Sequence, residues 1–414
     1  MNAVILVDPV SSGRFLKQTA HAMGYKVIVV YPYSTFYYSS VYGLTRESLC
    51  EECDQIIWEK ETSKILAFIQ SLNFSIKGCI PGNEGGVEIA EKIACSLGLL
   101  SNPRGSANVL KDKSLMREVL IKNNLSCPRF AICLSEEDVK EFAKEHSFPL
   151  VIKTPRGVAS AQVFICENLK QLIHYFREIT TKENPFEEKE RRALIEEYIG
   201  GPEYIVDVFS DGKRTHVTDV WLYEKENTPT FSNRCVSSIS IPLTDPAIQK
   251  LQSYALILAK AFQIERGPAH IEIKEDPRKG PTLIEIGGRL AGALLPEIIR
   301  QNSNLDLYQS TIEVFTKGTT ILPDPIIFKK HLAIYLFSSS KSGVIKNILG
   351  LDQIQKLPSY FSHTISVKIG DHISETTSLS THPGKLFLAN ADRDQLLQDI
   401  ERAKKLFVLS MEKT

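Results

Sequence analysis

Residues 270–286 read HIEIKEDPRKGPTLIEI, and they decide the local fold of this part of the chain. The two ends of the stretch alternate apolar and polar side chains as β-strands do, and the DPRKGP segment at residues 276–281 supplies turn residues. The stretch is therefore predicted to form a β-hairpin. If the strands pair symmetrically about the turn, Glu272 lies directly opposite Glu285.

The same register sorts the side chains of the hairpin between its two faces. One face carries the two carboxylates, and the other carries the apolar pairs, Ile271 with Ile286 and Ile273 with Ile284. Opposed side chains have Cβ atoms roughly 4.5–5.5 Å apart, so like charges there repel unless a cation lies between them. Mg²⁺ prefers oxygen ligands and commonly binds one or two carboxylates together with substrate phosphates. The hairpin therefore indicates a Mg-nucleotide site; the alternative is an exposed hairpin with two solvated glutamates.

The composition is that of a globular protein with several domains. The chain has 414 residues, and its 49 basic and 49 acidic side chains cancel, so no global field draws it to nucleic acid or to an anionic membrane. The eight cysteines include one close pair, Cys50 and Cys53, which without a second pair favours ordinary thiols. The N-terminal residues lack the pattern of a signal peptide, and no apolar stretch approaches the ~20 residues that span a bilayer. We therefore expect a cytoplasmic protein.

The first part of the chain is predicted to be an open α/β domain over residues 1–105. A strand, a helix and a second strand open it, an order typical of a parallel sheet covered by helices. The loop after the first strand lacks the G-x-G-x-x-G dinucleotide pattern. The elements expected here are strands at residues 3–7, 26–31 and near 79–80, and helices at 13–23 and 87–97.

The rest of the chain is predicted to be α+β, with one domain over residues 106–320 and a smaller one over 321–414. In the larger domain we expect helices at 112–123, 136–146 and 169–179, and strands at 150–153, 163–166, 193–199 and 204–210 before the hairpin. In the smaller domain we expect strands at 329–337, 364–369 and 384–391, and a helix at 393–407. The fold class is therefore α/β and α+β in three domains.

Two lysines and a loop of small residues are candidates for phosphate binding. Lys153 ends the apolar run Leu150-Val151-Ile152, where its ammonium is poorly hydrated unless an anion meets it. The following loop, RGVASAQ at residues 156–162, can bring backbone N–H groups close to phosphate oxygens. Lys113 opens a predicted helix. Each signal alone is weak, because a plain hairpin or a solvated lysine would explain it equally well.

Two further segments carry side chains suited to ligand binding. The segment LIEEYIGGPE at residues 194–203 is predicted to be a strand that runs into a tight turn. Backbone groups of Glu197 and Ile199 could pair with an adenine edge and Glu203 could accept from ribose hydroxyls; an edge strand with exposed acids is the alternative. Arg289 lies four residues after Glu285 in a glycine-rich segment, where a guanidinium can clamp a phosphate or carboxylate. An exposed structural arginine is the alternative there.

The ordered combination of these motifs is more specific than any one of them. Two lysines with a small-residue loop, then E-E-Y-I-G-G-P-E, H-x-E and E-x-x-x-R-x-x-G together resemble the ATP-grasp superfamily over about residues 1–400. The segment PGNEGGV at residues 81–87 resembles the end of that family's N-terminal domain. Among its branches the chain is most similar to the amino-acid ligases that make dipeptides, and biotin-carboxylase-like and purine-synthesis members are more distant.

The resemblance implies a role for each matched position. It assigns ATP phosphates to Lys113, Lys153 and the loop that contains Ser160, adenine to Glu196, Glu197 and Ile199, ribose to Glu203, Mg²⁺ (with Mn²⁺ as an alternative) to Glu272 and Glu285, and the transferred phosphate and reacting carboxylate to Arg289.

Three departures from the family pattern affect these roles. A glycine is usual where Gln162 stands, and an asparagine is usual where Gly287 stands. Dipeptide ligases often carry F-x-E-x-G-H where this chain has FSNRCV at residues 231–236. We therefore expect the closure of the loop at residues 156–162, the number of bound metal ions and the choice of substrate to differ from those usual in the family. Asn233 and Arg234 are candidates for contacting a substrate carboxylate or side chain.

The function implied is that of an ATP-dependent carboxylate–amine ligase. A substrate carboxylate attacks the γ-phosphate to give an acyl phosphate and ADP, and an amine then displaces phosphate, with amino acids expected as substrates. One alternative is a carboxylase-like or natural-product ligase of the same superfamily with a non-amino-acid partner. Another is a non-catalytic nucleotide-binding protein. A homodimer is a reasonable expectation.

Overall fold

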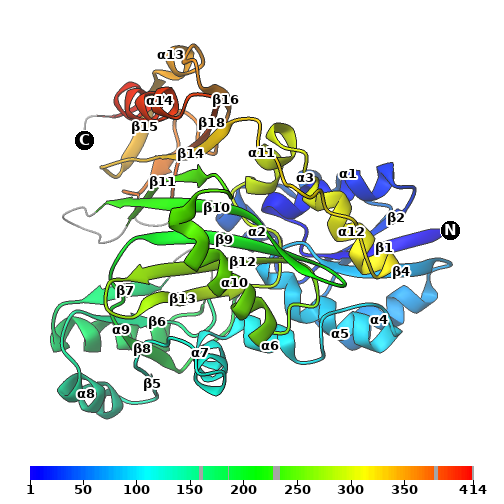
Figure 1. Cartoon of the computed structure of the whole chain (residues 1–414), viewed down its shortest axis with the longest axis horizontal. Coiled ribbons are helices and arrows are strands. Elements are labelled where there is room, and N and C mark those ends of the chain that lie inside the picture. The colour runs from blue at the N-terminus through cyan, green and yellow to red at the C-terminus, as the bar shows by residue number, and fades with distance from the viewer. Residues whose placement is uncertain (158–161, 185, 227–233, 377–380, 413–414) are drawn as a thin grey trace.

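The computed structural model describes residues 1–157, 162–184, 186–226, 234–376 and 381–412, and these residues form four β-sheets. An eight-stranded sheet lies in the middle of the molecule (Figure 1). The N-terminal sheet lies on one side of it and a small four-stranded sheet lies on the other (Figure 1). The expected mixture of α/β and α+β architecture is confirmed.

The N-terminal sheet is parallel, with strand order β3-β2-β1-β4. Alternate residues of its two central strands enter two different hydrophobic clusters, which is why both strands read as continuous apolar runs. The expected strand–helix–strand opening is confirmed, except that the first turn of the helix is a 3-10 helix. The elements are β1 Asn2–Val7, η1 Ser11–Arg14, α1 Phe15–Ala22, β2 Lys26–Tyr31, α2 Thr35–Tyr42, α3 Arg46–Cys50, β3 Gln55–Trp58, α4 Thr62–Ser71, β4 Ser75–Pro81, η2 Glu84–Gly86 and α5 Val87–Leu97.

The small sheet is antiparallel, with strand order β5-β8-β6-β7. Strand β8 lies between β5 and β6, so the alternative of an edge strand at residues 194–203 is wrong. Strand β8 also ends at Glu197, two residues earlier than expected. The elements are α6 Ser106–Lys111, α7 Lys113–Lys122, β5 Phe130–Cys133, α8 Glu136–Glu145, β6 Leu150–Lys153, β7 Val163–Cys166, α9 Leu169–Thr181 and β8 Ala193–Glu197.

The large sheet is antiparallel throughout, with strand order β13-β12-β9-β10-β11-β14-β18-β16. C-terminal strands extend the same sheet that holds the hairpin, and the domain boundaries near residues 105 and 320 stay a prediction. The elements are β9 Glu203–Asp211, β10 Thr215–Glu226, β11 Arg234–Ile241, η3 Pro246–Ile248, α10 Gln249–Ala261, β12 Arg266–Asp276, β13 Gly280–Gly287, α11 Leu295–Asn302, α12 Leu307–Lys317, β14 His331–Phe337, β16 Tyr360–Ile365 and β18 Gly384–Asn390.

A smaller sheet and two helices complete the C-terminal part. The sheet has the order β17-β15-β19. The strand expected at residues 364–369 is wrong in position, because β16 starts four residues earlier and ends at Ile365. The C-terminal helix is confirmed to within a residue. The elements are β15 Gly343–Leu349, α13 Leu351–Ile354, β17 His372–Ile373, α14 Arg393–Leu406 and β19 Val408–Met411.

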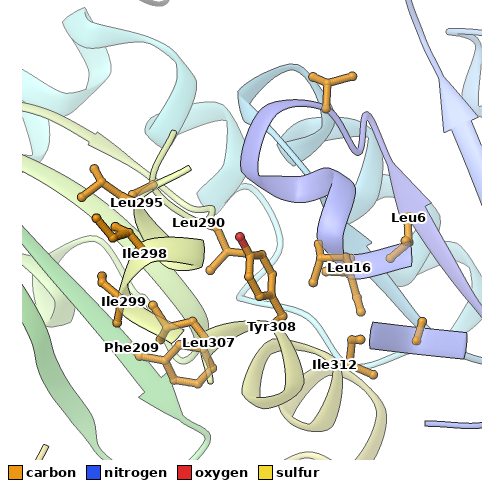
Figure 2. Close-up of a cluster of buried hydrophobic side chains, with 14 of the residues drawn as sticks. Leu6, Leu16, Phe209, Leu290, Leu295, Ile298, Ile299, Leu307, Tyr308 and Ile312 are labelled. Carbon is orange, nitrogen blue, oxygen red and sulfur yellow. The ribbon is translucent and has the colours of Figure 1, made fainter. Parts of the chain in front are cut away.

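One hydrophobic cluster joins the N-terminal sheet to the large sheet (Figure 2). Leu6 and Leu16 from the N-terminal unit pack toward Tyr308 and Ile312 of α12, and Phe209 of β9 belongs to the same cluster. All five side chains are fully buried, so burial of apolar area opposes separation of the two parts. This contact holds the N-terminal sheet against α12 and β9.

The cysteines and the helices bear on two general expectations from the sequence. All eight cysteines are free thiols, in agreement with the sequence analysis. Among the described residues, no helix has both the length and the apolar character needed to cross a membrane.

Candidate active site

The hairpin formed by β12 and β13 places Glu272 directly opposite Glu285, as predicted. Ile271 also pairs with Ile286 as predicted, but a bulge follows Glu272, so Ile273 pairs with Leu283. The expected pairing of Ile273 with Ile284 is therefore wrong. Ile284 turns to the carboxylate face and lines a cleft, while Leu283 joins the buried apolar face.

A cleft between the small sheet and the large sheet collects most of the predicted site residues. Its apolar wall comes from β6, β7 and the bulge. The predicted residues that line it are Lys113, Lys153, Glu196, Glu197, Ile199, Glu203, Glu272 and Glu285. The alternative of two solvated glutamates on an exposed hairpin is wrong, because the Glu272 and Glu285 side chains are only 21% and 27% exposed.

Lys113 joins the hairpin to the phosphate-loop candidate. It begins α7 directly after Asp112, whose side chain caps the helix, and this short cap fixes the lysine at the edge of the cleft. The Lys113 Nζ donates to the Gly157 carbonyl at 2.9 Å and lies 3.1 Å from the Glu285 Oε1. Its ammonium is therefore near both a metal-ligand candidate and the start of the small-residue loop.

Lys153 belongs to a buried trio of charges. The Glu196 carboxylate lies 2.6 Å from the Lys153 Nζ through one oxygen and 2.6 Å from the Arg117 Nε through the other. Burial acts to raise the pKa of Glu196, but Arg117 and Lys153 outweigh it and hold the pKa at about 2. Burial lowers the pKa of Lys153, and Glu196 opposes that effect. The Glu196 side chain thus holds Lys153 in place, a contact that the sequence analysis did not predict.

The segment after β8 forms the far end of the cleft. The Ile199 carbonyl accepts a hydrogen bond from the Lys274 Nζ at 3.0 Å, while the Glu197 carboxylate pairs with Lys279 and accepts from the Arg129 N–H. Gly201 has φ +79°, and a Cβ there would meet the Glu275 carbonyl oxygen at 2.0 Å. Only glycine permits this turn, which packs against the end of β12.

Glu203 lies between two lysines that the sequence analysis did not single out. The Lys225 Nζ is 2.6 Å and the Lys274 Nζ 3.8 Å from its Oε2. Lys274 could have been found, because His270, Glu272 and Lys274 alternate on one face of β12. Lys225 could not, since β10 reaches the cleft only through the pairing of the sheet.

Glu272 is held by a chain of polar side chains on three adjacent strands. The Tyr223 hydroxyl donates to its Oε1 at 3.2 Å, and the His270 Nε2 lies 3.7 Å from the same oxygen. The His270 Nδ1 is 2.8 Å from the Asp207 carboxylate. Burial lowers the pKa of His270, but Asp207 outweighs it and raises the pKa to about 10. Burial acts to raise the pKa of Glu272, and His270 outweighs it, so that the pKa falls to about 2.

The donor set fits a metal ion that binds together with a nucleotide. In the part of the chain that the structure describes, no group of three or more His, Cys, Asp or Glu side chains is arranged to hold a metal ion by itself. Glu272 and Glu285 supply two opposed carboxylates, and Gly287 adds no side chain. This is the arrangement in which Mg²⁺ completes its coordination with phosphate oxygens and water.

Arg289 lies beyond the hairpin and contacts the N-terminal unit. Its Nε donates to the Glu84 Oε2 at 2.9 Å and its Nη1 donates to the Leu290 carbonyl at 3.0 Å. Burial lowers the pKa of Arg289, and Glu84 and Glu285 outweigh it, so that the pKa is raised. The alternative of an exposed structural arginine is wrong, because only 15% of the side chain is exposed. The sequence analysis did not identify Glu84, although it lies in the quoted PGNEGGV segment.

The structure describes only one of the three predicted residues that remain. Arg234 starts β11, is 9% exposed and pairs with Glu226, and it does not line the cleft. Ser160 and Asn233 lie outside the described residues. Gln162, by contrast, is described and has φ +55°, a conformation that favours the glycine usual in the family.

Comparison with known proteins identifies the central part of the chain. Residues 146–297 match the model of the ATP-grasp domain. The chain is 24% identical over 401 residues to dapdiamide A synthase from Enterobacter agglomerans, covering 95% of this chain and 93% of that protein. It is 21% identical over 287 residues to an L-arginine-specific L-amino acid ligase from Bacillus subtilis, covering 68% and 67% of the two chains.

The fold has close structural neighbours of the same kind. The crystal structure of an L-amino acid ligase from Bacillus licheniformis matches with a TM-score of 0.82 at 18% identity, covering 100% of this chain and 99% of that chain. At this identity the likeness establishes the fold. Residues 146–297 thus match an ATP-grasp domain, and the proteins similar to this chain in sequence include an L-amino acid ligase.

Proposed function

We propose that this protein is an ATP-dependent ligase that joins a carboxylate to an amine, with amino acids as its substrates, and that releases ADP and phosphate. The observation that supports the proposal is one cleft that holds Lys113, Lys153 and the directly opposed Glu272 and Glu285, with Arg289 beyond the end of the same hairpin. Each type of side chain suits one part of phosphoryl transfer to a carboxylate. The relatives named as amino-acid ligases support the same class of substrate.

In the proposed mechanism, the nucleotide lies between the two sheets. The adenine contacts the backbone of Glu197 and Ile199 and the apolar wall of the cleft, and Glu203 accepts from the ribose. Lys113 and Lys153 bind the phosphates and draw off charge as it develops. Glu272 and Glu285 would hold Mg²⁺, or Mn²⁺ in its place, which neutralises negative charge on the phosphates when bound.

The reacting carboxylate is expected beside Arg289. Among the described residues, the Nη2 of Arg289 has no hydrogen-bond acceptor, while its Nε and Nη1 are both used. That free donor can orient a substrate carboxylate for in-line attack on the γ-phosphate. The resulting acyl phosphate then reacts with the amine, and phosphate leaves. The loop after Arg156 would exclude water from the intermediate.

The test is an initial-rate assay of phosphate release with MgATP and amino acids, supplied singly and in all pairs. The proposal predicts that at least one pair stimulates release well above either member alone, with one amide product and one ADP formed per phosphate. Stimulation by bicarbonate or by a non-amino-acid amine alone would favour another ATP-grasp chemistry. If no pair stimulates release, the proposed amino-acid substrates are wrong.

A further inference from the structure

A second pocket includes Arg156, the residue before Gly157 of the nucleotide cleft, in its lining. It is formed by Tyr33, Thr62 and Ile89 of the N-terminal unit together with charged side chains from five segments of the chain. We call it the basic pocket. Its charged residues are Lys60, Glu88, Lys92, Lys111, Arg156 and Glu188. Four cations face two carboxylates, which leaves a surplus of two positive charges.

Two of these cations are incompletely paired although they are largely buried. Only 4% of the Lys111 side chain is exposed, and its Nζ lies 4.0 Å from the Glu88 Oε2 and 4.2 Å from the centre of the Phe186 ring. The structure describes no hydrogen-bond acceptor for this ammonium. The Arg156 Nε is buried without a hydrogen-bond partner among the described residues, although the Glu188 carboxylate lies 3.5 Å away. A largely buried ammonium without an acceptor is unfavourable, so Lys111 favours an anionic ligand.

The remaining ion pairs give the basic pocket a fixed frame. The Glu88 carboxylate is shared by the Arg156 Nη2 at 2.8 Å and the Lys92 Nζ at 2.7 Å. The Glu188 carboxylate is 3.2 Å from the Lys60 Nζ. Each carboxylate is therefore already paired more closely with a cation other than Lys111. Lys111, at the back of the pocket, is the cation left with the least compensation.

Residues that are neighbours in the sequence line the basic pocket and the nucleotide cleft. Lys111 precedes Lys113 by two residues, and Arg156 directly precedes Gly157, whose carbonyl accepts from the Lys113 Nζ. Tyr33 also lines the basic pocket, and its hydroxyl donates to the carbonyl of Gly85, the residue after Glu84, at 3.4 Å. Glu84 contacts Arg289. A ligand in the basic pocket would therefore lie next to the place where the reacting carboxylate is expected.

We propose that the basic pocket binds a carboxylate group of an amino-acid substrate that does not itself react, with the Lys111 ammonium as the donor and the Arg156 guanidinium as a neighbouring positive charge. This inference rests on the proposed function. The ATP phosphates are assigned to Lys113 and Lys153 in the other cleft, and the reacting carboxylate must face Arg289 and the γ-phosphate. The α-carboxylate of the amino acid that supplies the amine is the anion still without a partner. A second carboxylate on the acid-donating substrate has the same chemistry.

The test uses a stimulating amino-acid pair and compares each substrate with its carboxamide analogue. We measure KM for the amine donor and for its α-carboxamide with the wild-type protein and with Lys111→Met. The wild-type protein is expected to show a KM at least about tenfold lower for the acid than for the carboxamide, the effect of losing one charge-assisted hydrogen bond. In Lys111→Met the KM for the acid is expected to rise by about that factor, while the KM for the carboxamide and for ATP stays within about twofold. A Lys111→Arg variant should restore the preference in part.

Controls separate the possible results. Lys64→Met removes an exposed lysine of α4 outside the basic pocket and should leave every KM unchanged. If Lys111→Met does not fold, Lys60→Met, which removes a cation 47% exposed at the rim, should raise the KM for the acid by a smaller factor. If the preference appears only for an extra carboxylate on the acid donor, that carboxylate is the ligand. If the amino-acid pair stimulates phosphate release by Lys111→Met normally, and this variant still prefers the acid to the carboxamide, the inference is wrong and the proposed function stands. If no pair stimulates phosphate release by the wild-type protein, both the inference and the proposed function are wrong.

Discussion

Removing the carboxylate of Glu196 tests the electrostatic frame that holds Lys153. Glu196 is the shared partner of Lys153 and Arg117, and all three side chains are 5% exposed or less. In Glu196→Gln the amide is nearly isosteric but carries no charge, so two buried cations lose their counter-charge. Breaking a buried pair by removing one partner is strongly destabilising, because the other charge stays buried.

The pKa of Glu196 gives the size of the effect. Its displacement from 4.5 to about 2 corresponds to about 3 kcal/mol, since each pKa unit is worth about 1.4 kcal/mol. Because the pKa is lowered in the folded protein, this contribution is fully present above about pH 4.5 and is lost as the pH falls toward 2. The stability difference between wild type and Glu196→Gln should therefore stay constant from pH 8 to about 5 and narrow below that.

Hydrogen exchange of the β8 backbone amides, followed by mass spectrometry, measures the loss of stability in the small sheet, which contains Glu196. A loss of about 3 kcal/mol predicts exchange about 100-fold faster at pH 7, together with a higher KM for ATP because Lys153 loses its fixed position. Glu137→Gln is the matched control on the same unit, because this side chain is 78% exposed; it should change β8 exchange by less than about twofold. Adding Lys153→Met to Glu196→Gln should recover part of the lost protection. An unchanged exchange rate in Glu196→Gln at pH 7, or a stability difference that does not narrow below about pH 5, would refute the reasoning.

Three further changes test other parts of the site. Glu285→Gln should lower ATP turnover by about 100-fold or more and raise the Mg²⁺ concentration needed for phosphate release; unchanged turnover would show that the metal assignment is wrong. Gln162→Gly removes a positive φ from a non-glycine residue and should stabilise the protein by up to about 1 kcal/mol in calorimetry, so a lower melting temperature would contradict the assigned strain. Gly201→Ala should destabilise by about 2 kcal/mol or more and raise the KM for ATP, because its Cβ would meet a backbone oxygen at 2.0 Å. Gly24→Ala has a similar φ with no atom within 4 Å of the new Cβ, so an equal effect there would show that the close contact is unimportant.

Local patterns in the sequence were sufficient to predict the centre of the site. The opposition of Glu272 and Glu285 follows from alternation about a short turn, and the structure has that register. The bulge that follows was not predictable, because a distant residue takes part in it. The Arg117 Nη2 donates to the Ile284 carbonyl at 2.8 Å, so the residue that the regular pattern would pair with Ile273 instead bonds to α7.

The side chains that compensate the charged residues were missed for a related reason. Arg117, Tyr223 and Lys225 come from α7 and β10, which meet the hairpin only in the folded protein. Strand β10 itself was not predicted, because charged side chains interrupt its alternation. Its Asp219 is fully buried and accepts from the Trp221 Nε1 at 2.6 Å, a contact that allows an acid inside a sheet. The sequence shows the residues that need a partner but not the partner.

The departure at Gly287 can be understood together with Glu84. A Cβ at position 287 would lie 2.5 Å from the Glu84 Oε2, so an asparagine there is incompatible with the position that Glu84 occupies. The same Glu84 oxygen accepts from the Arg289 Nε. The space left by the missing side chain is thus used to connect Arg289 to the N-terminal unit. Because Arg289 is expected to orient the reacting carboxylate, its position depends on the loop after β4, which also lies beside the basic pocket. Substrate recognition and the phosphate-binding groups would then be coupled through a single guanidinium.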